Sequence, residues 1–301
     1  MDIEIKDLSV SFPSESGRQK VLYETDLMVK CGKITAIVGE SGSGKSILGA
    51  AVMGLLDDSA EVSGSIRYGE TELLKLSEKE LNRIRGNGIG WISQDPIAAM
   101  NPLIRIGKQV VEAVCFHKKR KKEEEKGKGI KQLETFGLQD ASTLWSYYPY
   151  ELSGGMAQRV LISMMTFPHP EWLIADEPTK GLDAFVRKQV ADAFRKLQKQ
   201  GMGILLITHD LRLAECISDD IVIMYSGQII EKGKTDEVFK NPLHPYTRSL
   251  FNAAPDRRLL MEKNGKIPPY VGYKDMVKDK EKTKLIEKVA GHFVRTLGEE
   301  G

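Results

Sequence analysis

Residues 34–46 read ITAIVGESGSGKS, and this stretch decides the fold. Its first part, residues 34–38, is a short apolar run rich in β-branched residues, which is typical of a parallel strand buried on both faces. Its second part, Gly39 to Ser46, matches the phosphate-binding pattern G-x-x-x-x-G-K-[ST]. Residues 47–56 then continue as an apolar stretch that predicts a helix. A strand, a glycine-rich loop and a helix in this order predict a phosphate site at the helix N-terminus.

Each part of this loop has a physical role in holding phosphate. Glycine lets the backbone curl so that its N–H groups point at phosphate oxygens, and the helix N-terminus adds a partial positive charge. Lys45 is expected to reach the β- and γ-phosphates of a nucleotide, and Ser46 to offer its hydroxyl to Mg²⁺. The loop residues predicted to contact nucleotide are Gly39, Glu40, Ser41, Gly42, Ser43, Gly44, Lys45 and Ser46.

A second buried strand ends in two acidic residues. Residues 172–175 read WLIA, and Asp176 and Glu177 follow directly. The carboxyl ends of parallel strands meet at one edge of a sheet, so Asp176 is expected beside the phosphate loop, where it would help to organise Mg²⁺. Glu177 is then the candidate general base that polarises the attacking water.

Strand and helix patterns alternate along the rest of the chain, which favours a mainly parallel α/β sheet. Ser77 and Glu80 have the spacing of a capping box at a helix start. Strands are predicted at 3–12, 21–29, 61–69 and 203–208 and as a hairpin at 221–230, and helices at 77–85, 106–140 and 184–199.

Composition excludes several classes of protein. The 301 residues carry a formal net charge of +2, which argues against a general nucleic-acid-binding surface, and we expect no nucleic-acid partner. Cys31, Cys115 and Cys216 are too far apart in sequence to indicate a disulfide framework or a zinc module. The N-terminus lacks the pattern of a signal peptide, and no run approaches the 18 or so apolar residues of a membrane span.

Residues 152–159, LSGGMAQR, resemble the signature motif of ATP-binding-cassette (ABC) ATPases. Other motifs of that family occur in the same order, up to about residue 250. Gln94 looks like the Q-loop glutamine, residues 181–183 look like the D-loop, His209 looks like the switch histidine, and Phe12 looks like the aromatic residue that stacks on adenine. The resemblance implies an ATPase with a P-loop NTPase fold: a mainly parallel sheet core, an antiparallel β subdomain and a helical subdomain.

The resemblance also implies how the site works. Two such domains would meet head to tail, with ATP between the phosphate loop of one chain and the signature motif of the other. Gln94 would sense the γ-phosphate and Mg²⁺, and His209 would hold the water and Glu177 in line. With Lys45, Glu177 and His209 as catalytic residues, the further site residues implied are Phe12, Gln94, Ser153, Gly154, Gly155 and Asp183, with Ser46, Gln94 and Asp176 at Mg²⁺.

Four segments narrow the resemblance to a subfamily, the ATPases of oligopeptide, dipeptide and nickel importers. They are QDPIAAMNP, YPYELSGGMAQRV, LIADEPT and NPLHPYTRSL. This subfamily implies an ATPase domain at 1–235, with a helical subdomain at about 95–165, and a C-terminal extension at 236–301. It also implies a second ATPase subunit (a paralogue, giving a heterodimer), two transmembrane permease subunits, an extracellular substrate-binding protein, and a position at the cytoplasmic face of the membrane.

Three features depart from the family pattern. Lys180 and Gly181 replace the residues usual before the D-loop Leu-Asp, which leaves the D-loop geometry open. A basic run at 117–126 predicts a solvated helix face with i,i+4 ion pairs, the alternative being a nucleic-acid or lipid contact. Many relatives bind an iron–sulfur cluster through cysteines of the extension, but this chain has none after Cys216, so we predict no cluster.

Proteins with other functions also contain a phosphate loop, and their further sequence features differ from those of a peptide importer. A nickel or metal-chelate importer would use the same motifs. A soluble ABC ATPase of DNA repair would carry a long coiled coil between loop and signature, and one of translation would carry two cassettes; the sequence shows neither. A regulatory GTPase would need an Asn/Thr-Lys-x-Asp guanine reader, which is absent.

Overall fold

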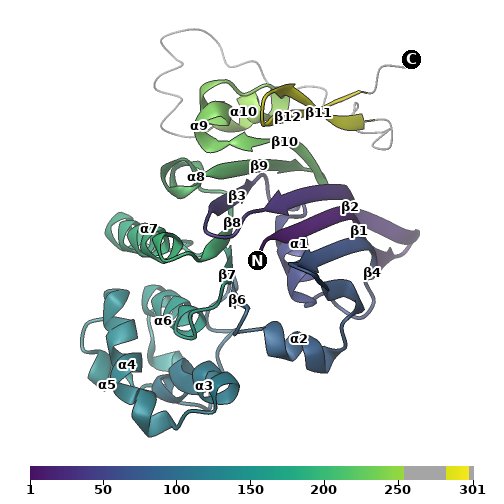
Figure 1. Ribbon diagram of the computed structural model, residues 1–301. Helices are drawn as coiled ribbons and strands as arrows, with labels where there is room; N and C mark the ends of the chain where they lie inside the picture. Colours follow the sequence, from purple (N-terminus) through teal and green to yellow (C-terminus); the bar gives the residue numbers. More distant parts are fainter. Residues whose placement is uncertain (254–282, 298–301) are drawn as a thin grey trace.

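An eight-stranded sheet forms the centre of the computed structural model, which describes residues 1–253 and 283–297 (Figure 1). The strand order is β11-β12-β10-β9-β3-β8-β7-β6. The strands β6, β7, β8, β3 and β9 run parallel, whereas β10, β12 and β11 add to the sheet as antiparallel neighbours. Their bounds are β3 Ile34–Val38, β6 Ile89–Ile92, β7 Trp172–Asp176, β8 Gly203–Thr208, β9 Asp220–Tyr225, β10 Gln228–Lys234, β11 Thr283–Val289 and β12 His292–Leu297.

The central strands are buried because helices cover both faces of this sheet (Figure 1). Side chains of β3 alternate between two cores: Ala36 packs in one with Phe194, and Ile37 packs in the other with Leu48. Helix α1 (Lys45–Met53) covers the second face, and α7 (Ala184–Lys199) and α8 (Leu211–Ile217) cover the first. The continuous apolar runs seen in the sequence are therefore strands buried on both sides, as predicted.

A smaller antiparallel sheet, ordered β2-β1-β4-β5, lies on the α1 side and shares that core. Its bounds are β1 Ile3–Ser14, β2 Gly17–Val29, β4 Glu61–Tyr68 and β5 Thr71–Glu72. The short helix η1 (Leu73–Lys75) and α2 (Glu78–Ile84) follow, and α2 begins with the predicted capping box of Ser77 and Glu80.

A helical subdomain with its own apolar core stands beside the sheets (Figure 1). Val110, Leu133 and Val160 meet in this core, each almost fully buried. The elements are α3 Ile106–Lys118, α4 Lys122–Thr135, α5 Ala141–Leu144, η2 Pro149–Glu151 and α6 Gly154–Thr166. Together the parallel core, the antiparallel sheet and the helices confirm the predicted fold class, while the exact domain boundaries stay a prediction.

The basic run at 117–126 is mostly exposed to solvent, as predicted, but it is not one helix, so that part of the prediction is wrong. Lys119 has a left-handed backbone with φ 52°, which ends α3, and α4 begins only at Lys122. Three acidic residues in the first turn of α4 suit the positive end of its dipole. One of them, Glu125, is buried and pairs with Arg120 and Lys128, with N–O distances of 2.9 and 3.0 Å.

The C-terminal part packs on the far edge of the main sheet. Helices α9 (Thr235–Lys240) and α10 (Pro245–Ala253) follow β10, and β12 then pairs with β10 through Glu231 and Lys232. Within the extension predicted at 236–301, residues 254–282 and 298–301 lie outside the described residues. Among the helices that are described, none combines the length and apolar character needed to cross a membrane.

Candidate nucleotide site

The phosphate loop lies at the carboxyl end of β3, which lies between β9 and β8 in the parallel set. Gly44 precedes the first helical residue of α1 with φ 96°, so the loop closes directly onto the helix N-terminus. In the sheet, Val38 lies beside Thr208, and Ile207 lies beside Asp176. The ends of β3, β8 and β7 therefore bring the loop and the acidic strand end together, as predicted.

Lys45 is almost buried, and its ammonium is surrounded by oxygen acceptors of its own loop. Its Nζ donates to the carbonyls of Gly39 at 2.8 Å and Glu40 at 2.7 Å and to Ser43 Oγ at 3.2 Å. Burial lowers the pKa of Lys45, and the nearby carboxylates of Glu177, Asp176 and Glu40 oppose that shift. The loop thus holds a cation over the place where phosphate oxygens are expected.

Asp176 has the properties of a metal-binding carboxylate. It is 4% exposed, and burial raises its pKa, whereas its hydrogen bond with Ser46 lowers it. Within the described part of the chain its Oδ1 atom has no hydrogen-bond donor. A buried carboxylate oxygen without a partner is costly unless a cation approaches it, so Asp176 and Ser46 fit a Mg²⁺ ion.

Glu177 and His209 form a pair across the ends of β7 and β8. Glu177 Oε1 accepts the backbone N–H of His209 at 3.0 Å and lies 2.7 Å from its Nδ1, and Oε2 accepts from Thr208 Oγ1 at 3.3 Å. The backbone of Glu177 is in the left-handed region with φ 49°, held by a hydrogen bond from its N–H to the carbonyl of Ile207 at 2.8 Å. Strain of this kind persists where surrounding bonds impose it, often at functional residues.

A cleft of about 610 Å³ joins these groups. Gln94, Glu177 and His209 line it together with part of the phosphate loop, so the structure brings these sequence-predicted residues together. Phe12 does not line this cleft; it is partly buried against the neighbouring core. The lining residues are Val21, Ser41, Gly42, Gly44, Lys45, Ser46, Ile47, Gln94, Glu177, Lys180 and His209.

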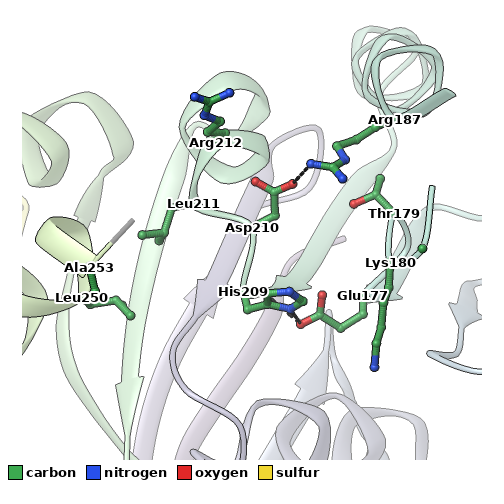
Figure 2. Close-up of a pocket in the computed structure, with 11 residues that line it drawn as sticks. Glu177, Thr179, Lys180, Arg187, His209, Asp210, Leu211, Arg212, Leu250 and Ala253 are labelled. Atoms are coloured by element: carbon green, nitrogen blue, oxygen red, sulfur yellow. Dashed lines mark hydrogen bonds and ion pairs between the residues drawn. The ribbon is translucent and has the colours of Figure 1, made fainter. Parts of the chain in front are cut away.

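A second pocket shares Glu177 and His209 with this cleft (Figure 2). In the wall of this second pocket, Asp210 accepts a hydrogen bond from Arg187 at 3.1 Å. Lys180 belongs to both spaces, and Leu250 of α10 also lines this second one. The C-terminal extension therefore reaches the surface next to the candidate catalytic pair.

The D-loop forms a tight turn between β7 and α7. Leu182 N donates to Thr179 O at 3.2 Å, and Gly181 takes φ 73° within that turn. Asp183 then caps α7 by accepting the N–H of Val186 at 3.0 Å. The glycine that departs from the family pattern is thus the residue whose backbone is left-handed.

The signature residues lie apart from this cleft, at the N-terminus of α6. Ser153 caps the helix by accepting the N–H of Met156 at 3.3 Å, and Ser153 and Gly154 are exposed. Gly155 is part of the first helical turn. Such an exposed helix start offers backbone donors outward, apart from the nucleotide cleft of this chain.

Four residues at the described site were not predicted from the sequence: Val21, Ile47, Lys180 and Tyr246. Lys180 lines the nucleotide cleft, although the sequence marked it only as a departure from the family pattern. Tyr246 accepts a hydrogen bond from the backbone of Glu40, yet the sequence indicated only that its segment belongs to the extension. The position of Lys180 close in sequence to Asp176 and Glu177 could have indicated its place at the site. No feature of the sequence around Tyr246 predicts its contact with Glu40.

With this geometry the molecule is a P-loop nucleotide-binding protein whose site lies at the carboxyl edge of a parallel sheet. A family profile described as ABC transporter matches residues 22–180, and one described as oligopeptide/dipeptide transporter, C-terminal region, matches residues 230–271. The chain therefore belongs to the ABC transporter family and is an ATPase of that family, which confirms the family and enzyme class predicted from the motifs.

Similar proteins agree with this assignment. The chain is 40% identical over 255 residues to the oligopeptide transport ATP-binding protein OppD of Lactococcus lactis subsp. cremoris, covering 84% of this chain and 75% of that protein. It is 38% identical over 256 residues to the dipeptide transport ATP-binding protein DppD of Haemophilus influenzae, covering 84% and 78%. The solved dimeric cassette MJ0796, described as a bacterial ABC transporter cassette, shares the fold with a TM-score of 0.72 at 24% identity, over 77% of this chain and 98% of that one.

Proposed function

We propose that this chain binds and hydrolyses ATP to power an importer of oligopeptides or dipeptides. The observation that carries the proposal is the match of residues 230–271 to the C-terminal region of oligopeptide and dipeptide transporters, outside the general ATPase cassette. The matches to relatives named for oligopeptide and dipeptide transport also cover 84% of this chain. The catalytic fold alone would not select a cargo.

The phosphates of ATP would be held by the loop and by Lys45. The Lys45 ammonium, which donates to the carbonyls of Gly39 and Glu40 in this structure, would donate to phosphate oxygens instead. The N–H groups at the start of α1 would face the same phosphates. Ser46, Asp176 and Gln94 would hold Mg²⁺. When bound, the ion neutralises phosphate charge.

Glu177 would accept the proton of the attacking water. Its Oε1 is fixed by the backbone N–H of His209 and by the His209 ring (Figure 2), and Glu177 also lines the nucleotide cleft. His209 would in turn stay oriented toward the γ-phosphate. Because the backbone N–H of His209 also holds Glu177, the His209 ring can turn toward a phosphate in the cleft while the carboxylate stays in place.

The exposed signature turn supports a partner in the closed state. Ser153, Gly154 and Gly155 would contact ATP bound to a second ATPase subunit, here proposed to be a paralogue, and Asp183 would lie at that contact. Phe12 would stack on adenine. The assembly would add two transmembrane permease subunits and an extracellular substrate-binding protein, with this chain at the cytoplasmic face of the membrane.

ATP use and cargo need separate tests. Lys45→Ala should abolish measurable ATP binding by the purified full chain, and normal ATP affinity and turnover in that variant would contradict the proposed site. For cargo, the complete transporter would be reconstituted in vesicles and its ATPase rate measured with peptides or with chelated nickel. Stimulation by peptides supports the proposal, while stimulation by chelated nickel alone would select the metal-chelate alternative.

A further inference from the structure

The C-terminal extension touches the phosphate loop directly. The backbone N–H of Glu40 donates to the hydroxyl of Tyr246 with an N–O distance of 3.2 Å. Tyr246 is the second residue of α10 and is 1% exposed, so this contact is inside the molecule. A residue of the extension and a residue of the nucleotide site are therefore joined across 206 positions of sequence.

One peptide group is held from both sides. The N–H of Glu40 and the carbonyl of Gly39 belong to the same planar peptide unit. Tyr246 accepts from the N–H, and Lys45 Nζ donates to the carbonyl at 2.8 Å. Any rotation of this peptide would break the bond to Tyr246 and carry the carbonyl away from Lys45. The tyrosine thus fixes the group against which the lysine rests.

Tyr246 is itself held rigidly. Its ring packs on Tyr225, at the end of β9, with ring centres 4.4 Å apart and planes inclined by 50°. Its backbone N–H donates to Nδ1 of His244 at 3.1 Å. Burial raises the pKa of Tyr246, so its hydroxyl keeps its proton and accepts the Glu40 N–H as a neutral group.

A buried carboxylate anchors the turn before Tyr246. Glu231 on β10 is fully buried and accepts the backbone N–H groups of Leu243 at 2.8 Å and His244 at 2.9 Å. The ring of His292, on β12, lies against the same carboxylate with an Nε2–Oε1 distance of 2.7 Å. Contacts therefore run without a gap from β12 through Glu231 and His244 to Tyr246 and the phosphate loop.

We propose that Tyr246 is a positioning residue of the nucleotide site: its hydroxyl holds the Gly39–Glu40 peptide in the orientation from which Lys45 engages the phosphates of ATP. The extension thereby preorganises the loop of its own chain. Without this bond the loop visits other peptide orientations, and apparent affinity falls with the fraction of molecules that remain competent. The inference rests on the nucleotide site of the proposed function.

The test removes one oxygen atom. Tyr246→Phe keeps the ring and its packing, and Tyr225→Phe is the matched control, since it removes a hydroxyl from the adjoining ring and leaves the Glu40 bond. ATP affinity of the full chain is measured by calorimetry with MgATP, and KM and kcat by phosphate release. Tyr246→Phe is expected to weaken ATP binding and raise KM about threefold to tenfold, the usual worth of one hydrogen bond, with kcat at saturating ATP close to the wild-type value.

Thermal unfolding of the same proteins separates positioning from mere packing. A purely structural role would lower Tm in Tyr246→Phe and leave ATP affinity at the wild-type value, and that result would overturn the inference. Equal losses of affinity in Tyr246→Phe and Tyr225→Phe would overturn it as well. If wild type binds ATP and Lys45→Ala does not, an unchanged Tyr246→Phe removes this inference alone; if Lys45→Ala binds normally, the proposed site itself is wrong.

A double-mutant cycle tests the anchor. Glu231→Gln removes the charge that holds the Leu243 and His244 amides and is expected to weaken ATP binding through Tyr246. The double variant Glu231→Gln/Tyr246→Phe should then bind ATP no more weakly than the poorer single variant. Additive losses would show that Glu231 does not act through Tyr246.

Discussion

The ring nitrogen Nδ1 of His209 lies 2.7 Å from Oε1 of Glu177, and the backbone N–H of His209 donates to that same oxygen at 3.0 Å. One carboxylate oxygen thus joins the end of β8 to the end of β7. Since the backbone bond depends on chain position alone, Glu177 keeps its direction even when the His209 ring turns toward a phosphate. The base is therefore held by the sheet, and the histidine ring is left to respond.

Glu177→Gln should retain ATP binding and slow hydrolysis by roughly 10²–10⁴-fold, because an amide keeps the shape of the side chain and cannot accept the proton of water. Stopped hydrolysis should also trap ATP-bound dimers of the ATPase subunits. Phosphate release measures the rate, and light scattering with MgATP measures the dimer. Glu70→Gln is the control, since the side chain of Glu70 is fully exposed, at 100%, and does not line this cleft. Normal turnover in Glu177→Gln would exclude it as the base.

Lys180→Thr should weaken ATP binding about twofold to fivefold. Lys180 lines the cleft and lowers the pKa of Asp176, so its charge is felt at the metal-binding carboxylate and would also be felt by phosphates. The contribution is modest because the side chain is exposed and screened by solvent. Calorimetry at two salt concentrations checks this, with Lys188→Thr on α7 as control. A loss that does not shrink at high salt would contradict the electrostatic account.

The protein should lose stability as pH falls from about 6.5 to about 4. Burial, then Arg295 and Arg248, lower the pKa of His244 to about 4, and its neutral Nδ1 accepts the N–H of Tyr246. Below its unfolded pKa of 6.5 the unfolded chain binds the proton first, so the stabilisation present above pH 6.5 is lost toward pH 4, in total on the order of 3 kcal/mol.

Urea unfolding from pH 7 to pH 4 measures this slope. His244→Asn offers an oxygen acceptor in place of Nδ1 and does not titrate, so its stability should change less steeply over the same interval. Glu231 and His292 face the same turn and stay unchanged in both proteins, which makes the difference between the two slopes specific to His244. Identical slopes would refute the assignment.

Gly181→Ala should destabilise the protein by about 1 kcal/mol, because φ is 73° at this position and an added methyl group would meet no other atom within 4 Å. Gly127→Ala is the opposite case. Gly127 lies inside α4, and an added methyl group there also meets nothing, so alanine should stabilise by roughly 0.5–1 kcal/mol. Urea unfolding compares the two, and equal shifts would show that backbone conformation is not the cause.

The parallel core and the catalytic edge of the sheet could be predicted because their signals are local. The run at 34–38 announces a buried strand, and the loop after it must lie at that strand's carboxyl end. Asp176 follows a similar run, so the two ends had to meet. The one helical segment predicted wrongly, at 117–126, fails for a local reason too: a left-handed residue, Lys119, breaks a run whose composition favours helix.

Contacts between residues far apart in the sequence could not be predicted from local sequence patterns. Nothing in the segment around Tyr246 indicates a partner 206 positions away, because a tyrosine hydroxyl suits many acceptors and donors. Strands β11 and β12 were missed as well. β11 contains Lys284 and Lys288 and has no buried residue, so the alternation of a strand with one buried face is weak there. Their place is set by the free edge of β10, which only the folded sheet provides.

The pairing of β12 with β10 has a consequence for hybrid proteins and for the exchange of segments between relatives. Residue 235 is the predicted end of the ATPase domain and is therefore an obvious place to divide the chain. Glu231 lies before this point, whereas the partners of its carboxylate, Leu243, His244 and His292, lie after it. A transplanted cassette ending there would leave the Glu231 carboxylate without these partners and the edge of β10 uncovered and open to self-association. Transplants that succeed should therefore carry the extension with the cassette, as one inherited piece.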